Sequence, residues 1–190
     1  MKTALLASYE KDAALLRLGK LLKANGWELL GSAGTAVYLN ENGIVCKDIA
    51  EKVGPPILGH RVVTLSREVQ AALLALPEDS AELSRLDIEP IDLVYVVLYP
   101  LEKAIADPKS TPKDVLGKTD IGGPTLLRSA AKGRRLTLSD PAQINDLEEW
   151  FSRGSPETER AALVMRLAAA AERRVADYVD ASARYWEKQV

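Results

Sequence analysis

The chain has 190 residues, of which 47% are apolar and 27% charged, with a formal net charge of −2, so a single soluble domain over residues 1–190 is expected. A charge near zero argues against nucleic-acid binding through a broad basic surface, and no run approaches the roughly 20 apolar residues of a membrane span. One cysteine, Cys46, excludes an intrachain disulfide and a thiolate metal cluster, which favours a cytoplasmic location.

Apolar runs and helical periodicities alternate along the chain. In chain order they predict a strand at 3–8, a helix at 12–25, a strand at 27–30, a helix at 36–42, a strand at 44–47, helices at 67–76 and 80–86, a strand at 91–99, a helix at 124–132, a strand at 136–138 and a helix at 141–151. A long C-terminal helix is predicted from Pro156, with Ser155 as its N-cap. This order predicts an α/β fold of three layers, a parallel sheet with helices on both faces, plus the long C-terminal helix.

The only histidine, His60, limits the chemistry open to the chain. One histidine cannot build a two-histidine zinc site, and no serine stands in the Gly-x-Ser-x-Gly turn of a serine hydrolase. The sequence also lacks the Gly-x-x-x-x-Gly-Lys loop of P-loop enzymes. We therefore expect no metal and no cofactor, and a chemistry carried by Lys, Asp, Tyr, Arg and backbone amides.

A glycine-rich turn, Gly31-Ser32-Ala33-Gly34-Thr35, follows a predicted strand and precedes a predicted helix. Small residues let the backbone approach a phosphate, whose oxygens the helix amides and the hydroxyls of Ser32 and Thr35 can bind. Lys11 would lie at the same carboxyl edge of the sheet and could neutralise the same phosphate. The alternative is a tight turn capped by Thr35, with Lys11 a solvated lysine at a helix start.

Two further segments carry candidate polar groups. In the segment 60–64, Arg61 and Thr64 suit a phosphate or carboxylate, or else are a surface arginine and a strand threonine. In the segment 119–132, Asp120 and Lys132 could serve as a proton-transfer pair. The polar positions Thr125, Arg128 or Ser129, and Lys132 share one helix face, which is also what an ordinary solvated face looks like.

Over nearly its whole length, the chain resembles the IMP cyclohydrolase domain, which has the methylglyoxal-synthase-like fold. The matching segments include 31–36, 61–65, 88–94 and 98–100, and the resemblance is densest and most specific at Asp120-Ile121-Gly122-Gly123-Pro124-Thr125-Leu126-Leu127-Arg128-Ser129-Ala130-Ala131-Lys132. In that family the domain is normally joined to a second, formyl-transferring half. We expect a free-standing domain here, without the transformylase half.

The resemblance implies an enzyme that closes a formamido imidazole carboxamide ribotide into a purine ribotide with loss of water, as a homodimer. The family's phosphate-binding residues fall on Lys11, Ser32, Gly34, Thr35, Arg61 and Thr64. Its catalytic tyrosine, aspartate and lysine fall on Tyr99, Asp120 and Lys132. The segment that carries the densest match adds four residues expected to contact the substrate, which are Gly122, Gly123, Thr125 and Arg128.

Several positions depart from the family pattern. The family's Arg-Val-Lys-Thr-Leu-His-Pro becomes Arg61-Val62-Val63-Thr64-Leu65-Ser66-Arg67, so a lysine that resembles an anion stabiliser is Val63. A family asparagine is Val97, and Tyr9 replaces a small polar residue near the phosphate. The chain is accordingly an IMP cyclohydrolase, an enzyme for a related ribotide in specialised metabolism, or a nucleotide-binding module without chemistry. Methylglyoxal synthase, which shares the fold, is a further alternative that the segment 120–128 disfavours.

Overall fold

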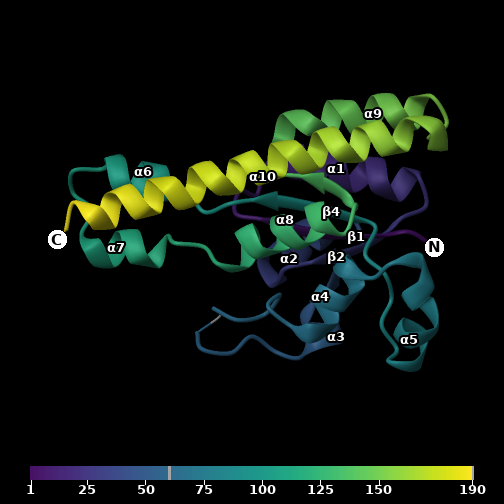
Figure 1. Cartoon of the computed structure of the whole chain (residues 1–190), viewed down its shortest axis with the longest axis horizontal. Coiled ribbons are helices and arrows are strands. Elements are labelled where there is room, and N and C mark those ends of the chain that lie inside the picture. The colour runs from purple at the N-terminus through teal and green to yellow at the C-terminus, as the bar shows by residue number, and fades with distance from the viewer. Residues whose placement is uncertain (60, 190) are drawn as a thin grey trace.

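The structure is a computed structural model that describes residues 1–59 and 61–189 (Figure 1). Strands and helices alternate through most of this part of the chain. Their order is β1 (Thr3–Ser8), α1 (Ala13–Ala24), β2 (Glu28–Gly31), α2 (Ala33–Glu41), β3 (Lys47–Asp48), α3 (Ala50–Val53), α4 (Arg67–Leu74), η1 (Pro77–Asp79), α5 (Ser80–Arg85), β4 (Leu93–Val97), α6 (Leu101–Ala106), α7 (Pro112–Gly117), α8 (Gly122–Lys132), β5 (Leu136–Leu138), η2 (Pro141–Gln143), α9 (Ile144–Ser152) and α10 (Glu157–Glu187).

The strands form one parallel sheet in the order β3-β2-β1-β4-β5. β1 is central and pairs with β2 on one side and with β4 on the other, where Ser8 lies opposite Val97. The paired residues Leu5–Leu6 of β1 and Val94–Tyr95 of β4 are fully buried, as expected for parallel strands that are covered on both faces. The predicted parallel α/β sheet is therefore confirmed.

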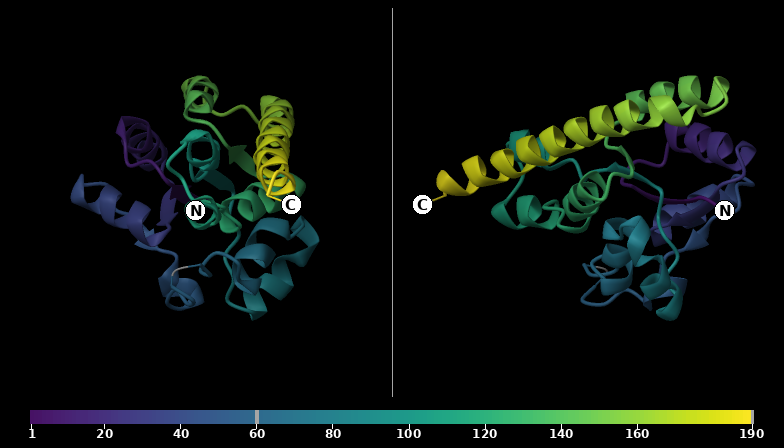
Figure 2. Two further views of the ribbon diagram at one scale, coloured as in Figure 1. Left: turned by 90° about the vertical axis from the view of Figure 1, so that its left-hand side faces the viewer. Right: turned by 45° about the vertical axis from the view of Figure 1, so that its right-hand side comes forward.

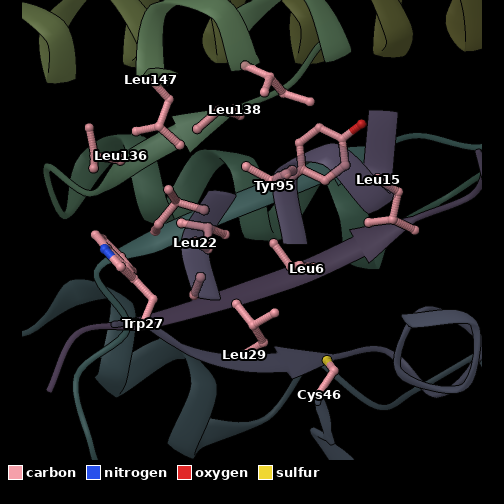
Figure 3. Packing of buried hydrophobic residues seen from close by; sticks show 14 of the residues in the cluster. Leu6, Leu15, Leu22, Trp27, Leu29, Cys46, Tyr95, Leu136, Leu138 and Leu147 are labelled. Atoms are coloured by element: carbon pink, nitrogen blue, oxygen red, sulfur yellow. The ribbon is translucent and has the colours of Figure 1, made fainter. Parts of the chain in front are cut away.

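Two apolar clusters cover the two faces of the sheet. On one face, α1, α2 and α9 pack on Leu6 and Tyr95 (Figure 3). On the other face, α4 and α8 pack on Leu5, Val94 and Val96. The predicted long C-terminal helix is α10, which lies along α8 and β5 and extends beyond the sheet to α6 (Figures 1 and 2). Its first half joins the α9 cluster and its second half joins the α8 cluster.

The structure corrects several predicted boundaries. α2 begins at Ala33 instead of residue 36, because the Ser32 carbonyl already accepts the N–H groups of Thr35 (2.7 Å) and Ala36 (2.9 Å). The third strand is only Lys47–Asp48. Ser155 is not the N-cap of α10: its φ is +56°, and Pro156 occupies the cap position instead. The short helices α3, α6 and α7 were not predicted, because one or two turns give too little periodicity.

Candidate functional site

The carboxyl ends of the three central strands lie side by side at one edge of the sheet. β1 ends at Ser8, whose backbone N–H donates to Thr35 Oγ1 (3.2 Å), the hydroxyl in the first turn of α2. On its other side, the Tyr9 N–H donates to the carbonyl of Val97, the last residue of β4 (3.0 Å). Parallel α/β sheets bind their ligands at this edge. The loops after β1, β2 and β4 therefore meet where a ligand site is expected.

A possible anion site, here called the cradle, is formed by Lys11, Ser32, Gly34 and Thr35. Gly31 ends β2, and a Cβ atom there would lie 2.9 Å from the Ala36 nitrogen, so only glycine lets α2 begin this close to the strand. The Ser32 side chain does not cap α2, because its hydroxyl donates to Thr35 Oγ1 instead (3.0 Å). The first amides of α2 are thus left for an outside acceptor, and the helix dipole favours an anion there.

Lys11 adds a positive charge to the cradle. Although the residue is exposed, its ammonium turns inward, donates to the Ser8 carbonyl and lies 3.9 Å from where a Cβ atom of Gly34 would stand. Partial burial lowers the pKa of this ammonium below its ordinary value. The cradle therefore combines a cation, the Ser32 hydroxyl and a helix N-terminus, which is the chemistry that binds a phosphate group. The Thr35 hydroxyl is fully buried and is bonded to Ser8 and Ser32.

A second group, here called the acidic turn, is formed by residues Asp120–Gly123 at the start of α8. The Asp120 carboxylate accepts the N–H of Gly123 (3.1 Å). A Cβ atom at Gly123 would lie 2.6 Å from Leu98 Cδ2 and overlap the Asp120 carboxylate, so this glycine allows the acid to pack against the residue after β4. The acidic turn and the cradle thus belong to the same edge of the sheet.

Burial raises the pKa of the Asp120 carboxyl above its ordinary value. Hydrogen bonds from the backbone amides of Gly123 and Gly122 oppose this rise in pKa, and no positively charged side chain contributes to it. A carboxyl that is desolvated yet held by amides at a helix N-terminus is suited to exchanging protons with a ligand. The environment of Asp120 therefore fits a general acid or base.

Tyr178 of α10 fixes the chain segment that leads into the acidic turn. It is 1% exposed, its hydroxyl donates to the Lys118 carbonyl (2.8 Å), and it accepts the N–H of Asp120 (2.8 Å). Burial raises its pKa to about 12, so it stays protonated and keeps the donor role. Tyr178 was not among the site residues predicted from the sequence, where the one clue is that a buried tyrosine needs a partner for its hydroxyl.

Tyr99 lies beside Tyr9 and Lys118 at the same edge. The rings of Tyr9 and Tyr99 have centroids 5.0 Å apart and are tilted by 58°. The Lys118 ammonium lies 5.2 Å from the Tyr9 ring centroid and 3.3 Å from its hydroxyl. Tyr9 and Lys118 therefore stand with Tyr99 between the cradle and the acidic turn, although Lys118 was not among the residues predicted from the sequence.

The loop before α4 carries two predicted phosphate ligands, Arg61 and Thr64, whose side chains make contacts in different places. Arg61 is exposed, and its Nε donates to the carbonyl of Leu58 in the same loop (2.7 Å). Thr64 Oγ1 lies 3.2 Å from where a Cβ atom of Gly122 would stand, so it belongs to the acidic turn. His60 lies outside the described residues. This loop therefore brings Thr64 to the site but directs the Arg61 side chain to its own backbone.

The polar residues further along α8 make contacts outside the cradle and the acidic turn. The Thr125 hydroxyl donates to the Ile121 carbonyl (2.7 Å), and Arg128 forms an ion pair with Glu172 of α10. Lys132 is exposed in the last turn of α8. Because α8 leads into β5, whose first residue pairs with the first residue of β4, its last turn lies at the amino edge of the sheet, about 15 Å from its first turn. Lys132 and Asp120 therefore lie at opposite ends of α8.

Two surface hollows include no residue of the cradle or the acidic turn. One runs along α1 and includes Arg17 and Glu148, and the other lies between α9 and α10. Within residues 1–59 and 61–189, no helix has the length and apolarity needed to cross a membrane. In the same residues, no group of three or more His, Cys, Asp or Glu side chains could hold a metal ion.

The MGS-like domain family matches residues 14–125. Three proteins described as the bifunctional purine biosynthesis protein PurH are similar to this chain. The one from Thermosynechococcus vestitus is 40% identical over 148 residues, covering 75% of this chain and 29% of that protein. Those from Aquifex aeolicus and Bacillus cytotoxicus are 38% and 37% identical, covering 80% and 94% of this chain and 31% and 37% of theirs. The chain thus spans about a third of the length of these relatives.

Among solved structures, the crystal structure of ForH is similar over almost its full length. It is 30% identical, with a TM-score of 0.83, and the match covers 97% of this chain and 98% of that chain. The fold and the long C-terminal helix are therefore shared with a protein of the same extent. Together with the family match over more than half of the residues, this similarity shows that the chain belongs to the MGS-like domain family.

Proposed function

We propose that this chain is an IMP cyclohydrolase-like enzyme, which closes a formamido imidazole carboxamide ribotide to a purine ribotide. One observation carries the proposal: the cradle adjoins the end of β1, and the acidic turn packs on Leu98 just after β4, so both lie at the same edge of the sheet. A phosphate held at Lys11, Ser32, Gly34 and Thr35 would direct the rest of the nucleotide across the ends of β1 and β4 towards Asp120. The similarity to the PurH proteins supports a purine-type ribotide as the substrate.

The reaction requires the substrate to be positioned and protons to be transferred, and it needs no cofactor. The carboxamide nitrogen attacks the formyl carbon and forms the new C–N bond. One proton from the carboxamide nitrogen and one from the formamido nitrogen leave with the formyl oxygen as water. In our proposal Asp120 accepts the first proton and returns it to the departing oxygen, because its raised pKa suits both directions. Tyr99 completes the hydrogen-bond relay, and Gly122, Gly123 and Thr64 line the reacting end.

A second candidate is ring closure on a related ribotide. The reacting end carries Val63 and Val97 in place of the family's polar residues, and it adds a lysine, Lys118, beside Tyr9. An altered set of donors would favour a ligand whose ring carries its acceptors elsewhere. If the chain binds a nucleotide at this site but does not close its ring, it is a nucleotide-binding module.

Calorimetric titration with IMP and with its open formamido precursor, combined with an assay of ring closure, tests the function. We expect both ligands to bind and the precursor to turn over. Lys11→Met should weaken both ligands at least about tenfold through loss of a charged hydrogen bond. Lys20→Met, which removes an exposed lysine of α1, is the matched control. Binding without turnover would support the nucleotide-binding module, and absence of binding would point to a different ligand.

Lys132 needs a separate test, because its position does not bring it to Asp120 within one subunit. Native turnover in Lys132→Ala would remove this lysine from the mechanism. Loss of turnover with native folding and native IMP binding would require Lys132 to reach the ligand from another subunit. The second result would support the homodimer that the resemblance implies, and sedimentation of the same variant would test it directly.

A further inference from the structure

Two half-exposed tyrosine rings stand between the cradle and the acidic turn. Tyr9 follows β1 and Tyr99 follows β4, and the pairing of Ser8 with Val97 brings the two rings side by side. Tyr9 is 39% exposed and Tyr99 is 42% exposed, so both rings keep surface open to solvent. Aromatic rings with a free face bind planar, electron-poor rings by offset stacking. The pair is thus a stacking surface at the place that a cradle-bound nucleotide would cross.

Lys118 brings a cation to this surface. Its ammonium donates to the Tyr9 hydroxyl (3.3 Å) and lies over the Tyr9 ring, so one of its three hydrogens is engaged. Among the residues that the structure describes, it forms no ion pair with a carboxylate. A lysine held by an aromatic ring, with donors to spare and no counter-ion, is prepared for an acceptor on a ligand.

The backbone of Lys118 is also fixed in place. Its carbonyl accepts the hydroxyl of Tyr178, the same group that holds the Asp120 N–H. Because one buried hydroxyl binds both residues, the Lys118 ammonium and the Asp120 carboxyl start from a backbone segment of fixed geometry.

We propose that Lys118 is a specificity-determining residue that binds an acceptor oxygen on the ring of the nucleotide while the ring stacks on Tyr9 or on Tyr99. This inference rests on the proposed function, because it takes the phosphate to be in the cradle. An ammonium can only donate, so Lys118 selects a ring oxygen over an amino group at the same place. The substrate class is accordingly a 5′-phosphorylated riboside with an oxo-substituted or carboxamide-bearing heteroaromatic ring.

Calorimetric titration with two probes separates ring recognition from phosphate recognition. IMP carries both the phosphate and an oxo-substituted ring, whereas ribose 5-phosphate carries no ring. Lys118→Met keeps an unbranched side chain of similar length and removes its charge, and Lys113→Met, on the exposed surface of α7, the helix that ends just before Lys118, is the matched control. We expect Lys118→Met to weaken IMP about tenfold or more, the effect of one charged hydrogen bond, and to leave ribose 5-phosphate unchanged. Lys118→Arg should keep most of the IMP affinity.

The other outcomes overturn the proposal in different ways. Unchanged IMP binding in Lys118→Met, with native binding by the wild type, overturns the role of Lys118 alone. An equal loss for both probes assigns the effect to folding or to the phosphate, and it also overturns a role in reading the ring. If the wild-type chain binds neither probe, the proposed function fails and this inference fails with it.

Discussion

The backbone N–H of Asp120 donates a 2.8 Å hydrogen bond to the hydroxyl of Tyr178, which lies 58 residues later in the chain. The same hydroxyl donates to the Lys118 carbonyl, so both of its hydrogen-bonding roles are filled by the segment that leads into α8. Tyr178 is buried in the apolar cluster between α10 and α8. The long C-terminal helix therefore supports the candidate site as well as the core.

We expect Tyr178→Phe to lower the free energy of unfolding by about 1–3 kcal/mol, because it leaves a partly buried N–H and a partly buried carbonyl without their partner. Turnover should fall more than IMP affinity, since the cradle is unchanged and only Asp120 loses its support. Thermal unfolding and steady-state rates measure the two effects. Tyr185→Phe, a change of the same kind in the same helix, is the control; equal behaviour of the two variants would contradict a positioning role for Tyr178.

Asp120→Asn should raise thermal stability at neutral pH while it removes turnover. Burial raises the native pKa of Asp120 above 3.8, so the native state binds this proton more tightly than the unfolded chain does. Wild-type stability then falls as the pH rises from 3.8 through the native pKa, and the penalty is fully present above it. Asparagine carries no charge and avoids the penalty, yet it can still accept the Gly123 N–H.

The pH dependence of this gain is the decisive measurement. Unfolding temperatures of Asp120→Asn and wild type should converge below pH 3.8, where the wild-type carboxyl is protonated in both states. A variant that is less stable than wild type at neutral pH would show that the ionised carboxylate stabilises the fold.

The wild-type rate of ring closure should rise with pH through the raised pKa of Asp120, because a base must be ionised to accept a proton.

The two glycines of the acidic turn should respond differently to the same substitution. Gly123→Ala places a methyl group 2.6 Å from Leu98 Cδ2 and onto the Asp120 carboxylate, which should destabilise the chain by about 1–3 kcal/mol and reduce turnover. Gly122→Ala places a methyl group 3.2 Å from the Thr64 hydroxyl, which can rotate away, and in ordinary contact with Asp120 Oδ1 at 3.8 Å. Both variants gain the same helix propensity, so their difference in unfolding free energy measures the clash. Equal stability of the two would refute the close packing at Gly123.

Much of the fold could be predicted from local patterns. The apolar run that contains β4 indicated a central parallel strand, and the leucine spacing of α1 indicated a helix, because burial on one or both faces leaves a period in the sequence. The glycine-rich turn after β2 indicated an anion site at the carboxyl edge, and the structure places Lys11, Ser32 and Thr35 there together. The roles of these residues remain predictions.

The packing of α10 could not be predicted in the same way. The polar face of α8 suggested ligand contacts for Arg128 and Lys132, but Arg128 pairs with Glu172 of α10, and Lys132 lies at the amino edge of the sheet. Local spacing shows which residues share a helix face; it does not show which neighbour that face meets. Only the tertiary structure decided that Asp120 is fixed by Tyr178, because a contact across 58 residues depends on how two helices pack, and no periodicity within either helix encodes it.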